Sequence, residues 1–240
     1  MSTVTSQTVG QTPVAVGKRK RKKRKSFVVV GAMTAEDFLD MPQDDGIDRE
    51  LIGGLVWEKG VTYRTRFHAN VEGRIAHLLN LWRDTNGIEG MIYSGEVGCV
   101  LSRDPERGNV VGIDVAFAAG DVEARMRDAI AALEAADTDT DQLTEKQRKE
   151  RHERRNRLLQ FPPTLAIEVH SPSDRRNWFG AKVQEYLHCG VELFWEVDPF
   201  FQTVIIHRPG AAPVMRNIEE RLTGDPVLPR FDVPVTELFK

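Results

Sequence analysis

Two acidic residues stand inside segments that are otherwise apolar, and these acids are the first candidates for chemistry. Asp114 lies in VVGIDVAFA and Glu168 in TLAIEV, and both segments have the composition of buried strands. A buried carboxylate without a partner is costly, and two carboxylates on adjacent central strands push one pKa upward unless a cation lies between them. Such hard oxygen ligands suit Mg²⁺, which binds through one or two carboxylates and keeps several waters. A buried ion pair with one of the chain's arginines would explain each acid about as well.

The segments that position these acids alternate between strand and helix patterns. Apolar runs of strand length lie at residues 91–101, 110–118, 164–169, 191–197 and 203–208. Two further short runs, 49–52 and 55–58, flank Gly53 and Gly54 and predict a β-hairpin near the N-terminus. Strands that alternate with helices indicate an α/β fold in which helices flank a mixed central sheet.

Three helices are predicted from periodicity and from capping residues. Apolar residues recur with helical spacing over 65–83, at Val71, Ile75, Leu78, Leu79 and Trp82. Thr34 is suited to cap a helix at 35–41. A further helix at about 174–188 ends before Gly190, which is a common residue after a helix C-terminus.

Residues 121–160 separate the two acidic strands and have an unusual composition. They are alanine-rich at first and then densely charged, as in LTEKQRKERHERRNRLL. We expect one or two exposed helices that form an insertion in the domain. Because the charges alternate in sign, a solvated helix is favoured over a second nucleic-acid-binding patch.

Eight consecutive cations near the N-terminus contrast with the rest of the chain; they are Lys18, Arg19, Lys20, Arg21, Lys22, Lys23, Arg24 and Lys25. The formal net charge is −3, so the remainder carries −11 once these eight charges are set aside. We expect residues 1–26 to form a disordered basic tail and residues 27–240 to form the folded domain. The acidic body does not attract nucleic acid by its average charge, so the tail would supply that affinity. An alternative use of the tail is an address signal, as in nuclear localisation.

Little in the sequence would direct the chain to a membrane or to an oxidising compartment. No apolar run in it approaches the ~20 residues that span a bilayer. Residues 27–33 are at the lower limit for the apolar part of a secretory signal, and the polar leader before them is unusually long. Cys99 and Cys189 are too few for a disulfide scaffold or a four-thiolate zinc site. We therefore expect a cytoplasmic protein with reduced cysteines.

Several motifs along the chain resemble those of one bacterial family. They are RELIGGLV at 49–56, a histidine at 68, IDVAF at 113–117, LAIEVHSPSD at 165–174, K-x-x-x-Y at 182–186 and GVELFWEVDP at 190–199. Together they resemble the Uma family of restriction-endonuclease-like proteins, within the PD-(D/E)XK nuclease superfamily. The resemblance covers about residues 33–239, whereas the basic tail and the 121–160 insertion have no counterpart in the family core.

The resemblance implies a restriction-endonuclease-like fold and a set of site residues. Asp114 and Glu168 would hold the metal, Mg²⁺ or alternatively Mn²⁺, and Glu50 would be a further acidic ligand or a water-orienting group. The superfamily's lysine stands two residues after the second acid, where this chain has His170, so Lys182 on the next helix is the expected substitute. A cation is needed there to stabilise charge that develops on a phosphate. His170 would share this role only when protonated.

His68 and Tyr186 are further candidates for the site. His68 lies on the same helix face as Val71 and Ile75. Two interpretations stay open, a histidine packed in the core and a histidine that faces the site. Tyr186 lies one turn after Lys182 and would orient that lysine or stack near the substrate, although ordinary packing explains it equally well.

The leading hypothesis is therefore Mg²⁺-dependent hydrolysis of phosphodiester bonds in DNA, with the metal on Asp114 and Glu168 and with Lys182 stabilising charge. The alternative is a non-catalytic nucleic-acid-binding protein on the same fold, tethered by its basic tail. A third hypothesis makes the body a protein-interaction module. Nucleic acid, DNA in the first place, is the expected partner, and no membrane partner is expected. A homodimer is one option for the oligomeric state.

Overall fold

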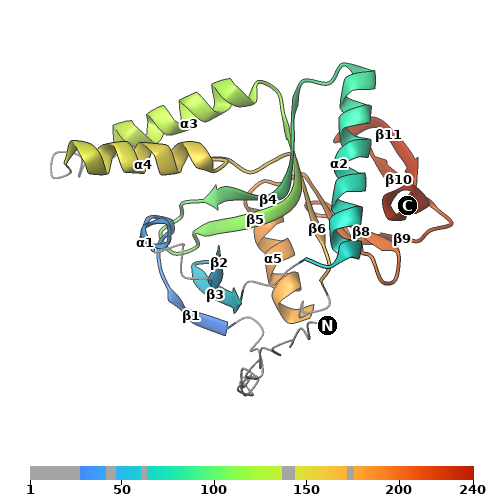
Figure 1. Cartoon of the computed structure of the whole chain (residues 1–240), viewed down its shortest axis with the longest axis horizontal. Coiled ribbons are helices and arrows are strands. Elements are labelled where there is room, and N and C mark those ends of the chain that lie inside the picture. Colours follow the sequence, from blue (N-terminus) through green and yellow to red (C-terminus); the bar gives the residue numbers. More distant parts are fainter. Residues whose placement is uncertain (1–27, 42–46, 61–63, 137–143, 172–175) are drawn as a thin grey trace, which may run out of the picture.

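The protein is built around one large mixed sheet, shown in the computed structural model of Figure 1. The structure describes residues 28–41, 47–60, 64–136, 144–171 and 176–240. The predicted basic tail lies outside the described residues. Within these ranges, nine strands form the sheet in the order β1-β3-β2-β5-β6-β7-β8-β9, with β4 also paired to β5. Among the described residues, no helix has the length and apolar content needed to cross a membrane.

The N-terminal elements lie at one edge of the sheet; they are β1 (Val28–Ala32), α1 (Ala35–Asp40), β2 (Ile47–Ile52) and β3 (Leu55–Gly60). The predicted hairpin is confirmed, because β2 and β3 pair antiparallel across Gly53 and Gly54, which both have positive φ angles. The predicted cap is also confirmed, since the Thr34 side chain accepts a hydrogen bond from the Asp37 amide. The hairpin sets β2, which carries Glu50, beside the centre of the sheet.

Two long antiparallel strands lie side by side in the sheet. β4 (Gly90–Ser102) and β5 (Asn109–Ala119) pair along most of their length. The other edge of β5 pairs with β2 at one end and with β6 (Leu165–Val169) at the other. Asp114 of β5 and Glu168 of β6 therefore lie on adjacent interior strands, as the sequence predicts.

A βαβ unit follows the second acidic strand. β6 leads through α5 (Arg176–His188) into β7 (Leu193–Asp198), which pairs with β6 in parallel. β8 (Thr203–His207) and β9 (Val214–Arg216) extend the sheet in antiparallel fashion. Because parallel neighbours need a crossover connection, α5 lies over one face of the sheet.

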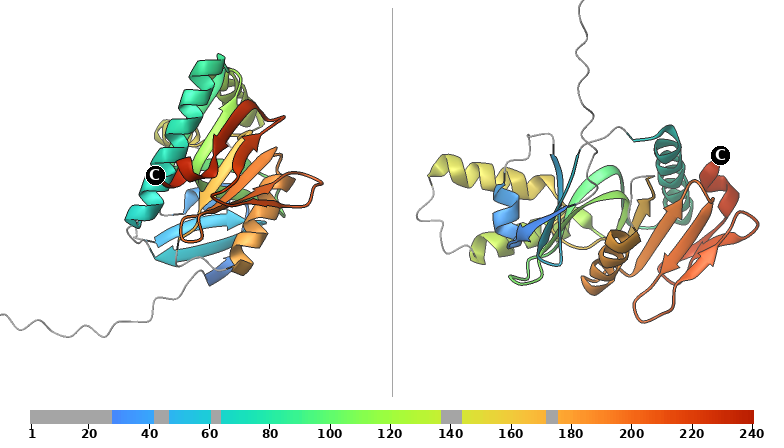
Figure 2. Two further views of the ribbon diagram at one scale, coloured as in Figure 1. Left: turned by 90° about the vertical axis from the view of Figure 1, so that its right-hand side faces the viewer. Right: turned by 90° about the horizontal axis from the view of Figure 1, so that it is seen from below.

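Different helices bury the two faces of the sheet, as Figure 2 shows. α2 (Arg66–Asn86) covers one face, in an apolar cluster that includes Ile75 and Val115. α5 covers the other, in a cluster that includes Tyr186 and Ala116. Successive residues of β5 thus point to different helices, which is the expected alternation in a strand.

The described residues of the segment predicted as a helical insertion form two helices. α3 (Val122–Ala136) and α4 (Glu145–Arg157) contact each other and extend from one end of the molecule, away from α2 (Figure 1). Thr144 starts α4 with a capping box to Gln147, and most residues of this charged helix are exposed. α4 therefore has the solvated surface that its alternating charges indicate.

The C-terminal segment contains elements that the sequence pattern does not predict. β10 (Arg221–Gly224) and β11 (Leu228–Pro234) form a separate two-stranded sheet, followed by a short 3₁₀ helix, η2 (Val235–Phe239). Phe231 and Leu238 join the apolar cluster that α2 forms with the sheet. The C-terminal segment thereby holds α2 against the strands that carry the acids.

Candidate active site

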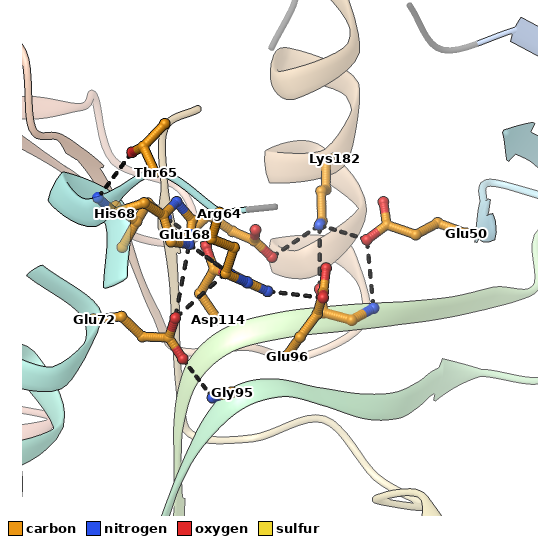
Figure 3. A network of polar contacts seen from close by, with 12 residues as sticks. Glu50, Arg64, Thr65, His68, Glu72, Gly95, Glu96, Asp114, Glu168 and Lys182 are labelled. Carbon is orange, nitrogen blue, oxygen red and sulfur yellow. Dashed lines mark hydrogen bonds and ion pairs between the residues drawn. The ribbon is translucent and has the colours of Figure 1, made fainter. Parts of the chain in front are cut away.

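Lys182 lies at the centre of a buried ion-pair cluster between β2, β6 and α5 (Figure 3). Its Nζ atom is 2.9 Å from Glu50 Oε1 and 2.9 Å from Glu168 Oε1. It also donates a hydrogen bond to the Gly112 carbonyl oxygen at 3.3 Å. An ammonium group has three donors, and three acceptors of the described residues lie within reach of it. Because the Lys182 side chain is only 2% exposed, this charge is fixed inside the protein.

Tyr186 and the second oxygen of Glu50 complete this cluster. The Tyr186 hydroxyl donates to Glu168 Oε1 at 2.8 Å, so this oxygen meets both Lys182 and Tyr186. The two residues are one turn apart on α5 and therefore share a helix face. Glu50 Oε2 is buried and has no hydrogen-bond partner among the described residues. This oxygen is available as a ligand.

Burial governs the protonation of this cluster. It raises the pKa of Glu168 to about 8, an effect that Lys182 opposes and that Asp114 and Glu50 strengthen. Burial likewise raises the pKa of Glu50, although Lys182 opposes it. For Lys182 itself, burial lowers the pKa, but the two carboxylates raise it above its usual value. The cluster thus has more carboxylate than one lysine can balance.

Asp114 belongs to a second cluster on the α2 side of the site. Its Oδ2 atom accepts a hydrogen bond from the Val169 amide at 2.8 Å. Its Oδ1 atom is 3.3 Å from His68 Nε2 and contacts Arg64. Burial raises the pKa of Asp114, but His68, Arg64 and the Val169 amide hold it well below the usual range. Asp114 is therefore a carboxylate at neutral pH.

The first turns of α2 supply His68 and Glu72. Thr65 caps the helix, and its hydroxyl accepts a hydrogen bond from the His68 amide at 3.2 Å. His68 and Glu72 are four residues apart and lie on one face of the helix. One donor atom from each, together with an Asp114 oxygen, lies within 4.8 Å of the others. These three buried residues form a group of metal-ligating type.

A bulge in β4 brings two more groups to this second cluster. The register of β4 against β5 shifts over residues 94–97, where β4 has one residue more. Gly95 and Glu96 have φ angles of 92° and 65°, in the region that favours glycine. The Gly95 amide donates to the Glu72 carboxylate, and Glu96 Oε2 is 2.8 Å from Arg64. The bulge thus turns the Glu96 side chain toward the site.

The donor set of the two clusters fits a divalent cation. Within the described part of the site, carboxylates outnumber cations: Glu50, Glu72, Glu96, Asp114 and Glu168 surround Arg64 and Lys182. Carboxylate oxygens suit Mg²⁺ and Mn²⁺, and an imidazole nitrogen is a common additional ligand for transition metals. The buried Glu50 oxygen without a described partner is consistent with this excess of ligands.

The structure brings most of the predicted site residues together. Glu50, Glu168, Lys182 and Tyr186 share the first cluster, and Asp114 and His68 share the second. His170 makes different contacts from these residues. Its Nε2 atom is 2.7 Å from Glu196 Oε1 on β7, and its ring packs on Phe179. The other oxygen of Glu196 is 3.1 Å from His207 Nε2. The predicted nucleic-acid-binding residues 18–25 lie outside the described residues.

Arg64, Glu72 and Glu96 also belong to the site and are not predicted from the sequence. Glu72 has a usable signal, because it stands four residues after His68 on the apolar face of a predicted helix. Glu96 approaches the site only through the bulge, for which the preceding glycine is a weak signal. Arg64 precedes α2, where the sequence has no regular pattern to interpret.

A solved structure has the same fold. It is the crystal structure of a protein from Anabaena variabilis ATCC 29413 described as "a putative nuclease belonging to DUF820", with a TM-score of 0.61 and 16% sequence identity. The likeness covers 86% of this chain and 97% of the other. It confirms the predicted fold class, an α/β fold with a large mixed sheet flanked by helices.

A family model matches the second half of the chain. The model is Uma2, described as "Putative restriction endonuclease", and it matches residues 138–236. This stretch contains Glu168, Lys182 and Tyr186, whereas Glu50 and Asp114 lie before it. The predicted resemblance to the Uma family is thereby confirmed over this part of the chain. No protein with a curated description matches the sequence.

Proposed function

We propose that this protein is a metal-dependent nuclease that hydrolyses phosphodiester bonds, in DNA in the first place. The observation that carries the proposal is the buried cluster in which Lys182 bridges Glu50 and Glu168 beside Asp114. Buried ion pairs are weak contributors to stability compared with apolar packing. Strongly shifted pKa values concentrate at functional sites. The likeness to a family model described as "Putative restriction endonuclease" and to a crystal structure described as "a putative nuclease" supports the same function.

Asp114 and Glu168 would hold the divalent cation, Mg²⁺ or Mn²⁺. Both carboxylates are buried, and they lie on the adjacent strands β5 and β6. Oxygen ligands from one or two carboxylates are what Mg²⁺ uses in proteins. When bound, such a cation activates water for attack and neutralises charge on the phosphate.

Other residues of the chain would hold the charges of the site in place. Lys182 presents a positive charge beside Glu168, where it would stabilise charge that develops on the phosphate. Glu50 and the Gly112 carbonyl oxygen accept hydrogen bonds from its ammonium group. The Tyr186 hydroxyl binds the Glu168 carboxylate. Groups held by several hydrogen bonds need little rearrangement during a reaction, which is the condition for electrostatic catalysis.

The basic segment 18–25 would supply affinity for the nucleic acid. Eight contiguous cations can neutralise several phosphates and release their counterions, whatever the base sequence. The remainder of the chain is acidic and repels a polyanion on average. Binding would therefore depend on the tail, and cleavage on the folded domain.

A second candidate is a non-catalytic nucleic-acid-binding protein on the same fold. The ion pairs that Arg64 and Lys182 already form with the acids of the site favour this candidate. A fold that supplies its own counter-ions does not need a metal ion to tolerate buried carboxylates. Metal-dependent turnover separates this candidate from the nuclease.

A cleavage assay with the full-length protein tests both candidates. Labelled single-stranded DNA, double-stranded DNA and RNA of one sequence would be incubated with Mg²⁺, with Mn²⁺ or with EDTA. Binding to the same molecules would be followed by fluorescence anisotropy. We expect cleavage products from DNA with either metal ion and none with EDTA. Binding without products in every metal condition would favour the non-catalytic candidate.

A further inference from the structure

The guanidinium group of Arg64 lies in the middle of the cluster formed by His68, Glu72 and Asp114 (Figure 3). Its Nη1 atom contacts Asp114 Oδ1 and His68 Nε2 and is 3.4 Å from Glu72 Oε2. Its Nη2 atom is 2.8 Å from Glu96 Oε2. A cation that belongs to the chain itself therefore occupies this cluster.

The atoms that contact Arg64 Nη1 are also those that a metal ion would use. One imidazole nitrogen and two carboxylate oxygens lie within 4.8 Å of one another in this cluster. Ligands bound to one Mg²⁺ at about 2.1 Å lie within roughly 4.2 Å of each other. Small side-chain movements would thus close this set on an ion. A guanidinium group and an ion cannot occupy the same place together.

The two cations of the site among the described residues differ in how deeply they are buried. Lys182 is 2% exposed and lies between two buried carboxylates. The Arg64 side chain is 28% exposed, and its partner Glu96 is 42% exposed. A long arginine side chain can move its charged head toward water while its stem stays packed. Arg64 is therefore the cation that an incoming ion would displace.

From these contacts we propose that His68, Glu72 and Asp114 form a divalent-cation site, and that Arg64 is its built-in occupant, which the ion replaces. The inference rests on the proposed metal-dependent function and adds His68 and Glu72 to the ligands named there. Arg64 neutralises the acids when no ion is bound, and it weakens ion binding by competing for the same atoms. Asp114 belongs to both ligand sets.

Calorimetric titration of the full-length protein with Mn²⁺ and with Mg²⁺ tests this inference without an activity readout. Arg64→Ala should tighten ion binding by about tenfold or more, because charged hydrogen bonds no longer compete. Arg66→Ala is the matched control, since Arg66 is exposed, lies two residues away and places its guanidinium over the Phe67 ring. The control should change the affinity by no more than about twofold. Adding His68→Ala to the Arg64→Ala protein should reverse this gain in ion affinity.

Thermal unfolding gives a second readout of the same competition. In EDTA, Arg64→Ala should have a lower Tm than the wild type, because Glu72 and Asp114 lose their cation. Mn²⁺ should then raise the Tm of the variant more than that of the wild type, since a tighter ligand stabilises the folded state more. Arg64→Gln gives the same comparison if the alanine variant does not fold.

Each pattern of results has one meaning. If the wild type binds the ion and Arg64→Ala binds it equally or more weakly, the inference is overturned while the metal-dependent function stands. If neither protein binds Mn²⁺ or Mg²⁺ at millimolar concentration, both are overturned. Tighter binding by Arg64→Ala that survives His68→Ala would place the ion elsewhere and overturn the proposed site.

Discussion

Replacing Lys182 by methionine would leave two buried carboxylates without their shared cation. Glu50 and Glu168 each lie 2.9 Å from the ammonium group, and the Lys182 side chain is 2% exposed. Removing one partner of a buried ion pair destabilises a protein by about 3–5 kcal/mol. In a domain of this size, that corresponds to a fall in Tm of roughly 6–20 °C. Methionine keeps most of the side-chain volume, so the lost charge is the main change.

This loss of stability should depend on pH, and the dependence separates charge from packing. Burial raises the pKa of Glu168 to about 8 even with Lys182 present, and removing the lysine raises it further. A carboxyl group with a raised folded-state pKa stabilises the fold below its unfolded value of about 4.3. That contribution is lost as the pH rises through the folded-state pKa. The variant should therefore be closer to the wild type at about pH 6 than at about pH 9.

Urea unfolding in EDTA, followed by circular dichroism at both pH values, measures the effect. Lys146→Met is the control, because Lys146 and Glu150 form an exposed pair at 3.7 Å and such pairs contribute little. Glu50→Gln in the Lys182→Met background should restore part of the lost stability, since it removes one uncompensated acid. A Lys182→Met protein as stable as the wild type at both pH values would show that the cluster is not held by charge.

The same contacts predict three further results. Glu168 must lose its proton to bind a cation, so Mn²⁺ affinity should fall by up to about tenfold for each pH unit below its pKa of about 8. Calorimetry on Glu168→Gln should show a shallower dependence on pH. Burial raises the pKa of Glu196, but His170 and His207 lower it to about 2. The stability that Glu196 provides is therefore present above about pH 4.3 and lost toward pH 2, and the difference in unfolding free energy between wild type and Glu196→Gln should shrink over that range. Deleting residues 1–25 should flatten the plot of log K for DNA binding against the logarithm of salt concentration by a few units of slope, at about 0.9 per neutralised phosphate. An unchanged slope in anisotropy titrations would exclude the tail as a DNA contact.

The central strands could be predicted because they consist almost entirely of apolar residues. β5 and β6 are buried nearly throughout, so a single acid in each is conspicuous. The hairpin at Gly53 and Gly54 is specified by local turn chemistry, which is independent of the rest of the fold. β9, β10 and β11 are shorter or mix exposed and buried residues, so their patterns carry less information.

The candidate site could be predicted only in part. Lys182 and Tyr186 are accessible to sequence reasoning because a spacing of four residues places both on one helix face. Glu96 and Arg64 are not, because their positions depend on a bulge in β4 and on the approach of the segment before α2. Contacts of this kind are set by tertiary packing, and the local sequence does not encode them. Glu72 is intermediate, since an acid on an apolar helix face is a visible anomaly.

Cleavage of DNA by the Asp114→Asn protein decides whether this carboxylate serves metal-dependent hydrolysis. Asparagine keeps the size of the side chain and an oxygen for the Val169 amide, and it removes the charge. Glu150→Gln, a change at an exposed helix position, is the matched control. With Mg²⁺ or Mn²⁺, the wild type and Glu150→Gln should cleave labelled DNA at equal rates, and the folded Asp114→Asn protein should be slower by about a hundredfold or more. Metal-dependent cleavage by Asp114→Asn at the wild-type rate would contradict the mechanism proposed for this site.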